Sequence, residues 1–201
     1  MLAAIAAILT VATGCIKFRV SDPKRTATEQ LLLSTAADHA MLQIDVSMIA
    51  GRKTFLNTTY FDAYDKEYII GSFRDLFLSS GVLLVDTAAE AEVVVEVRSG
   101  AFSIDGADTL TGIPTLPFPV PFAGVVQTPE VSLYKSERHK SIAKFALVAY
   151  ERESRKHVTS IGPTVGTAYD NHYQFLGMIK FETTDIPEKQ TLKKFWKRKK
   201  K

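Results

Sequence analysis

Two segments of this 201-residue chain alternate apolar and polar side chains with a period of two, and this alternation constrains the fold most strongly. Residues 93–98 carry valine at every odd position, against Val94, Glu96 and Arg98 at the even positions. Residues 144–150 carry Phe, Leu and Ala at alternate positions. A period of two is that of a strand whose side chains point to two faces in turn. We therefore expect a sheet with one buried, apolar face.

Two other segments space their apolar residues by three and four, which is typical of a helix with one buried face. The first covers residues 27–48 and begins after Thr26. Together with Glu29, Thr26 fits a capping box, in which each side chain accepts a hydrogen bond from the other's backbone amide. The second covers residues 66–80 and ends at Gly81. We expect both helices to pack against the sheet.

β-Branched and aromatic residues predict further strands, at 53–60, 82–85, 157–161, 165–169 and 175–181. A helix separates the first two of these strands, so we expect them to pair in parallel through a crossover. Together the elements predict an α/β (α+β) sandwich, with a mixed sheet of about six or seven strands and two main helices packed on one face. A single globular domain is expected over residues 26–190.

Residues 105–129 interrupt this pattern, because they hold five of the eight prolines and carry no charge between 110 and 126. Proline lacks an amide hydrogen, so we expect a long apolar loop without secondary structure of its own. An apolar loop in water is a candidate contact with a protein partner or a membrane, and the residues expected to make it are Leu116, Phe118 and Phe122. The alternative is a flap that folds over a sheet face and closes the core.

The first fifteen residues are typical of a lipoprotein leader. An eleven-residue run at 2–12 is apolar except for one threonine. It is too short to span a bilayer but has the length of a signal-peptide core. Residues 12–15, Ala-Thr-Gly-Cys, resemble a bacterial lipobox and contain the one cysteine of the chain. The resemblance implies a signal peptide at 1–14, cleavage after Gly14 and lipidation of Cys15.

The match departs from a lipobox at Ala12, where leucine is usual, and no basic residue precedes the apolar run. An apolar N-terminal helix in a cytosolic core, with Cys15 as a buried free thiol, is the alternative. Lipidation leads us to expect a palmitoylated lipoprotein that is stably anchored by several acyl chains and faces the periplasm. Residues 15–25 would form the tether. Because Ile16 is not the aspartate that retains lipoproteins in the inner membrane, we expect the outer membrane, with the inner membrane as the alternative.

The formal net charge of +3 at pH 7 comes from the C-terminus. Residues 193–201 hold seven of the 25 basic residues and no acid, so the rest of the chain carries 18 basic and 22 acidic residues, a net charge of −4. We assign a basic tail to residues 191–201. Contact with anionic lipid or peptidoglycan is expected there through Lys193, Lys194, Trp196, Lys197, Arg198 and Lys199. The alternatives are a solvated tail without a partner, or nucleic-acid binding in the cytosol, which secretion excludes.

Residues 80–86, Ser-Gly-Val-Leu-Leu-Val-Asp, are followed by the segments 88–91 and 92–98 and later by a hairpin at 146–156. This order resembles the periplasmic domain shared by the curli-secretion channel lipoprotein, the penicillin-binding-protein activator lipoproteins and related envelope lipoproteins. Residues 26–34, Thr-Ala-Thr-Glu-Gln-Leu-Leu-Leu-Ser, and the proline-rich segment are similar to an uncharacterised family of proteobacterial lipoproteins. That family implies an envelope location and has no assigned activity.

We find no catalytic motif and expect no enzyme, cofactor or metal. No Gly-x-Ser-x-Gly elbow occurs, and the four histidines, at 39, 139, 157 and 172, lack metal-ligand spacing. The expected function is a non-enzymatic binding or assembly-accessory role, with an envelope protein or a second copy of the chain as partner. The alternative is a periplasmic hydrolase that uses Asp170 and His172.

Overall fold

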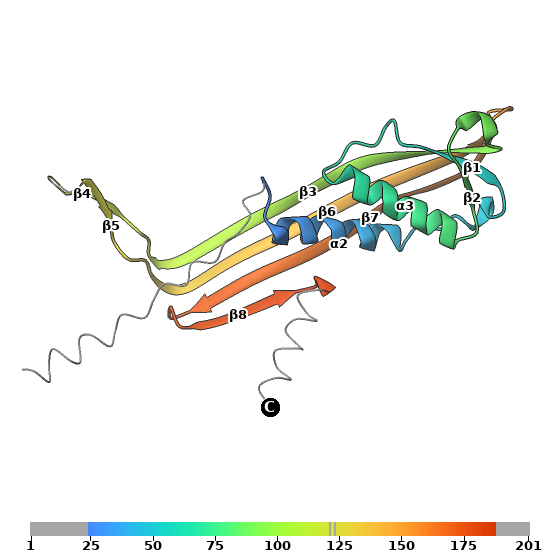
Figure 1. Cartoon of the computed structure of the whole chain (residues 1–201). Helices are drawn as coiled ribbons and strands as arrows, with labels where there is room; N and C mark the ends of the chain where they lie inside the picture. The colour runs from blue at the N-terminus through green and yellow to red at the C-terminus, as the bar shows by residue number, and fades with distance from the viewer. Residues whose placement is uncertain (1–23, 121, 123, 188–201) are drawn as a thin grey trace, which may run out of the picture.

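The computed structural model describes residues 24–187 except residues 121 and 123. An elongated sheet carries two helices on one face at one of its ends, and a separate small hairpin lies at the other end (Figure 1). In chain order the elements are α2 (Ala27–Met41), η1 (Ser47–Ile49), β1 (Lys53–Asn57), α3 (Lys66–Ser79), β2 (Leu83–Val85), η2 (Ala88–Glu90), β3 (Val93–Ile113), β4 (Pro117–Val120), β5 (Gly124–Gln127), β6 (Val131–Glu151), β7 (His157–Phe175) and β8 (Ile179–Thr184).

The main sheet has six strands in the order β2-β1-β3-β6-β7-β8, and β4 and β5 form a second sheet. β1 pairs in parallel with both β2 and β3, whereas the remaining neighbours are antiparallel. The predicted α+β fold with a mixed sheet and two helices is confirmed. The predicted parallel pair is confirmed as well, since α3 connects β1 to β2 and places Lys53 opposite Leu83.

The first helix begins as the sequence predicts. The Glu29 amide donates to Thr26 Oγ1 at 3.2 Å, and the Thr26 amide donates to the Glu29 carboxylate at 2.7 Å. The helix ends at Met41 and does not reach residue 48. Beyond it the chain turns and remains on the core, so Ile44 is buried without being helical, and this apolar spacing made the predicted helix too long.

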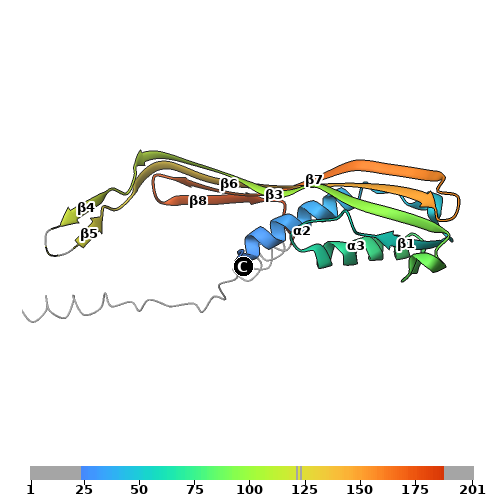
Figure 2. The ribbon, with the colours of Figure 1, turned by 90° about the horizontal axis from the view of Figure 1, so that it is seen from above.

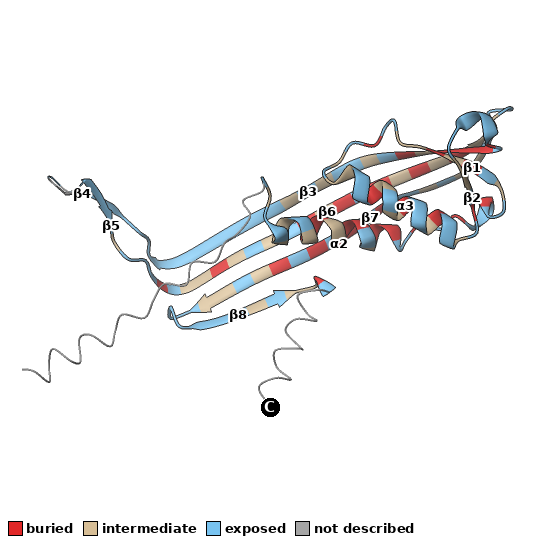
Figure 3. Cartoon of the chain, viewed as in Figure 1, coloured by how far each residue is buried: buried red, intermediate tan, exposed pale blue. Residues whose placement is uncertain are grey.

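The core lies where α2 and α3 cover the sheet, and burial falls off toward the other end (Figure 3). Its centre is an aromatic cluster in which the rings of Phe61, Phe73 and Phe145 lie 5.5–6.1 Å apart between centroids. Tilted and edge-to-face ring pairs at this spacing are favourable beyond the area that they bury. The cluster joins α3 to β6 and fixes the helical layer on the sheet.

β7 is one continuous strand, whereas the sequence predicts two strands that break at Gly162-Pro163. The register shifts at this point, so that Gly162 and Pro163 together lie opposite Ala146 of β6. This arrangement is a bulge, and a bulge accommodates proline because the bulged residues make no ladder hydrogen bond. The strand therefore continues through the proline.

The prediction of one strand at 175–181 is wrong, because a turn divides this segment. β7 ends at Phe175 and β8 begins at Ile179. Leu176 and Gly177 between them have φ angles of 48° and 69°. Left-handed backbone at these two positions reverses the chain, as in a tight hairpin. The two strands therefore lie side by side.

The proline-rich segment 105–129 is not a loop without secondary structure. β3 extends to Ile113, β6 starts at Val131, and β4 and β5 pair with each other between them. The two long strands thus carry a small hairpin away from the helices (Figure 2). Strands form here because Pro117 and Pro119 occupy alternate positions of β4, which leaves the positions between them to make the ladder hydrogen bonds.

Candidate functional site

The projecting hairpin, residues 116–128, presents large apolar side chains to solvent. Phe122 is fully exposed, and Phe118 and Leu116 keep about half of their surface exposed. Val125 and Val126 of β5 are exposed too. The structure therefore places all three predicted contact residues together on one projection. A flap that closes the core would bury them, so that alternative is wrong, while contact with a partner stays a prediction.

The two edges of this hairpin differ chemically. The Thr128 amide donates to the Leu116 carbonyl at 3.0 Å, so this pair is a hydrogen-bonded one. Antiparallel pairs alternate, and the next pair, Pro117 with Gln127, is therefore a non-hydrogen-bonded pair. The same holds for Pro119 with Val125. The outer edge of β4 thus lacks amide donors at both prolines, whereas the amides of Val125 and Gln127 point outward from β5.

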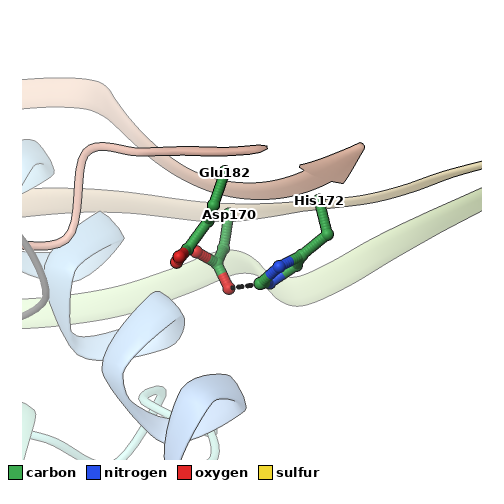
Figure 4. Close-up of side chains that lie close together, drawn as sticks. All are labelled: Asp170, His172 and Glu182. Carbon is green, nitrogen blue, oxygen red and sulfur yellow. Dashed lines mark hydrogen bonds and ion pairs between the residues drawn. The ribbon is translucent and has the colours of Figure 1, made fainter. Parts of the chain in front are cut away.

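A second group of side chains, from β7 and β8, brings Asp170 and His172 together with Glu182 (Figure 4). His172 Nε2 lies 3.1 Å from Asp170 Oδ2. Glu182 is the cross-strand neighbour of His172. Asp170 is fully buried, while the His172 side chain is about half exposed. One ligand atom from each of the three residues lies within 4.8 Å of the other two.

A groove of about 630 Å³ opens beside this cluster. His172 and Glu182 line it, together with Lys135, Glu137 and Lys180. Lys135 Nζ lies 3.4 Å from a Glu137 oxygen and 3.5 Å from a Glu130 oxygen. The hydrogen bond and charge of these two carboxylates raise the pKa of the Lys135 ammonium. The groove is therefore open to solvent beside the cluster, and charged side chains line it.

The sequence identified Asp170 and His172 but missed Glu182. The residue is ten positions beyond His172, and only the turn at Leu176-Gly177 brings it back. That glycine between two apolar segments was the available signal for a hairpin. The spacing of the histidines along the chain could not reveal this cluster, because the strand register brings its three residues together.

The arrangement contains two of the three groups of a hydrolytic triad. The hydroxyl that the strand register brings next to Asp170 belongs to Thr184. This hydroxyl donates to the Tyr169 carbonyl at 3.2 Å. The Thr184 hydroxyl is therefore bound to the backbone of β7, and the hydrolase alternative stays a prediction.

Two other histidines have structural roles. His39 Nδ1 lies 2.8 Å from the Thr167 carbonyl and ties α2 to β7. His157 Nε2 lies 2.8 Å from Ser160 Oγ at the far end of β7. Gly14, Cys15, the signal peptide predicted at 1–14 and the tail predicted at 191–201 lie outside the described residues, including the tail's candidate residues from Lys193 to Lys199. Within the described part of the chain, no helix is long and apolar enough to cross a membrane.

The structure defines an α+β fold, in which a six-stranded sheet carries its helices at one end and a separate two-stranded apolar hairpin at the other. By sequence, the chain belongs to a family of unknown function (DUF6655), which matches residues 12–194. Membership in an uncharacterised family agrees with the resemblance seen in residues 26–34. No curated protein matches the chain.

Proposed function

We propose that this protein is a lipid-anchored component of a bacterial cell envelope, without enzymatic activity, and that the β4–β5 hairpin binds a protein partner there. The exposure of Phe118, Phe122 and Val125 at the tip of a hairpin outside the core carries this proposal. Large apolar side chains that gather on an exposed projection mark a contact surface. The helices lie at the opposite end of the sheet, so they leave the tip free to reach a partner (Figure 2).

A protein surface suits this tip better than the interior of a lipid bilayer. β4 and β5 form a sheet of two strands, so each strand has an outer edge. Within lipid, an outward amide such as that of Val125 would lose its water without gaining an acceptor. Each such group costs roughly several kcal/mol. A protein strand laid along β5 supplies those acceptors.

Strand addition to β5 is therefore the expected mode of contact. The outward amides of Val125 and Gln127 offer backbone donors at alternate positions, as strand addition requires. The edge of β4 is protected by Pro117 and Pro119, and proline is a common device against pairing at an edge. The partner is an extended apolar segment of an envelope protein, which a second copy of this chain can also provide.

The anchor and the tail complete the proposal and rest on the sequence. Lipidation of Cys15 holds the chain to the outer membrane, and residues 15–25 serve as the tether. The basic tail at 191–201 contacts anionic lipid or peptidoglycan on the same surface. The resemblance to the curli-channel and penicillin-binding-protein activator lipoproteins supports an assembly-accessory role at that membrane.

Site-specific photo-crosslinking in living cells tests the hairpin contact. A photoreactive phenylalanine analogue replaces Phe118 or Phe122 at the tip, and Leu42 at the helical end is the matched control. Leu42 is 84% exposed, so its accessibility is comparable to that of the tip. We expect one defined protein adduct from both tip positions and none from position 42. Adducts to lipid alone, or equal yields at all three positions, would contradict the proposal.

A further inference from the structure

We propose that Asp170, His172 and Glu182 form a binding site for a divalent transition-metal ion, for which Zn²⁺ is the best-fitting example. The site is independent of the hairpin contact. It stands on the strand register, the burial of Asp170 and the groove beside the cluster.

The register places all three side chains on one face of the sheet. Asp170 and His172 are two residues apart on β7, and side chains at this spacing share a face. Glu182 lies directly opposite His172 on β8, and directly opposed residues of antiparallel strands also share a face. Figure 4 shows the three side chains leaving the strands in the same direction. Two adjacent, regular strands thus hold the cluster.

The distances require only a small movement for an ion to be bound. The candidate ligand atoms lie within 4.8 Å of one another. Ligand atoms around a tetrahedral ion lie about 3.3 Å apart, given bonds of roughly 2.0–2.1 Å. His172 and Glu182 are both partly exposed, so their side chains can rotate toward the ion while the buried Asp170 stays in place.

The donor set fits a transition metal better than Mg²⁺ or Ca²⁺. One imidazole and two carboxylates make a mixed nitrogen and oxygen set, whereas Mg²⁺ and Ca²⁺ take oxygen ligands. A buried carboxylate beside a second carboxylate is unfavourable unless a positive charge balances the pair. A divalent ion supplies two charges at the point where Asp170 and Glu182 meet. His172 and Glu182 line the groove, which leaves a fourth ligand position open to solvent.

The neighbouring strand places two further ionisable residues at register positions opposite the cluster. His139 lies opposite Asp170, and Glu137 lies opposite His172, both on β6. Glu137 already contacts Lys135, so its charge is engaged. His139 is partly exposed and stands next to the buried carboxylate. The strand register therefore leaves His139 as a further candidate ligand beside the three primary residues.

Zn²⁺ titration of the untagged full-length chain by calorimetry tests the site. Every sample carries Cys15→Ala, so that the chain's thiol contributes no ligand. The test variants are His172→Ala and Glu182→Gln, which change partly exposed residues and leave the buried Asp170 intact. His157→Ala is the matched control, because His157 is an exposed histidine on the same strand. Denaturation midpoints in chelator verify that every variant folds.

We expect one Zn²⁺ per chain, a higher denaturation midpoint with Zn²⁺ than with Mg²⁺, and a visible absorption band when Co²⁺ replaces Zn²⁺. Loss of an outer-shell partner alone weakens metal binding by about tenfold, so each test variant should weaken it by more than that. The control should bind as the parent does. No stoichiometric binding, equal binding of Mg²⁺, or binding in either test variant as tight as in the parent would overturn the proposal.

Discussion

Gly166 of β7 lies directly against the backbone of α2, where an added Cβ would overlap the Ala36 carbonyl oxygen and the Ala40 amide nitrogen. The helix approaches the strand this closely because neither Ala36 nor Ala40 has a long side chain. On the neighbouring strand, β6, Ser141 Oγ donates to the Leu32 carbonyl of α2 at 2.7 Å. Small residues on both sides therefore set the position of α2 on the sheet.

Replacement of Gly166 by alanine tests this contact. The new methyl group has no space, so the helix or the strand must shift, and overpacking of this kind typically costs about 1–3 kcal/mol. We expect urea denaturation to show a loss of stability of at least this order. Gly71→Ala is the control, because a Cβ at Gly71 of α3 meets nothing within 4 Å. Alanine there should stabilise by about 0.5–1 kcal/mol. Equal effects at the two positions would contradict the packing.

Tyr150 is expected to couple folding stability to pH near and above pH 10. Burial of its hydroxyl, with the hydrogen bond to Glu96 and the charge of that carboxylate, raises the pKa of Tyr150 above its usual 10.0. The folded state therefore holds this proton more tightly than the unfolded state does. The contribution is fully present below the unfolded pKa and is lost as the pH rises through the folded pKa.

Denaturation midpoints measured below and above pH 10 check this expectation. We expect the parent to lose stability as the pH rises, and Tyr150→Phe to lose less over the same range. Tyr60→Phe serves as the control, because Tyr60 is mostly exposed and its removal should leave the parent's dependence intact. A Tyr150→Phe profile that parallels the parent's would show that this hydroxyl does not contribute.

The proposed anchor predicts a specific N-terminus. In a bacterial host, the N-terminal peptide of the membrane fraction should begin at Cys15 and carry the mass of acyl chains. Cys15→Ala should remove the modification and release the chain from the membrane, because the acyl chains supply the binding free energy. Mass spectrometry of the peptide from both versions decides the point. An unmodified chain that begins at Met1 would contradict the anchor.

Elements whose partners are near in sequence were predicted well. The capping box at Thr26 joins residues three apart, and the parallel pair of β1 and β2 follows from the helix between them. These features need only local spacing and the handedness of a crossover. They could therefore be predicted without knowledge of any distant contact, and the structure confirms them.

Features that depend on strand register were not predictable in the same way. Glu182 reaches His172 only because the turn after Phe175 sets the register of β8. Pro117 and Pro119 argued against strands, yet they are tolerated because both fall at positions that face away from β5. The effect of a proline on a strand depends on the direction of its missing amide, which the sequence alone does not give.

The most direct test of the proposed function combines the tip crosslink with a change at each hairpin edge. Val125→Pro removes an outward amide of β5 without touching the pairs that bond β4 to β5, and Pro119→Val is the matched change on the protected edge. With the photoreactive group at position 122, we expect the protein adduct to disappear in Val125→Pro and to persist in Pro119→Val. An adduct that survives Val125→Pro, or is lost equally in both variants, would contradict strand addition at β5.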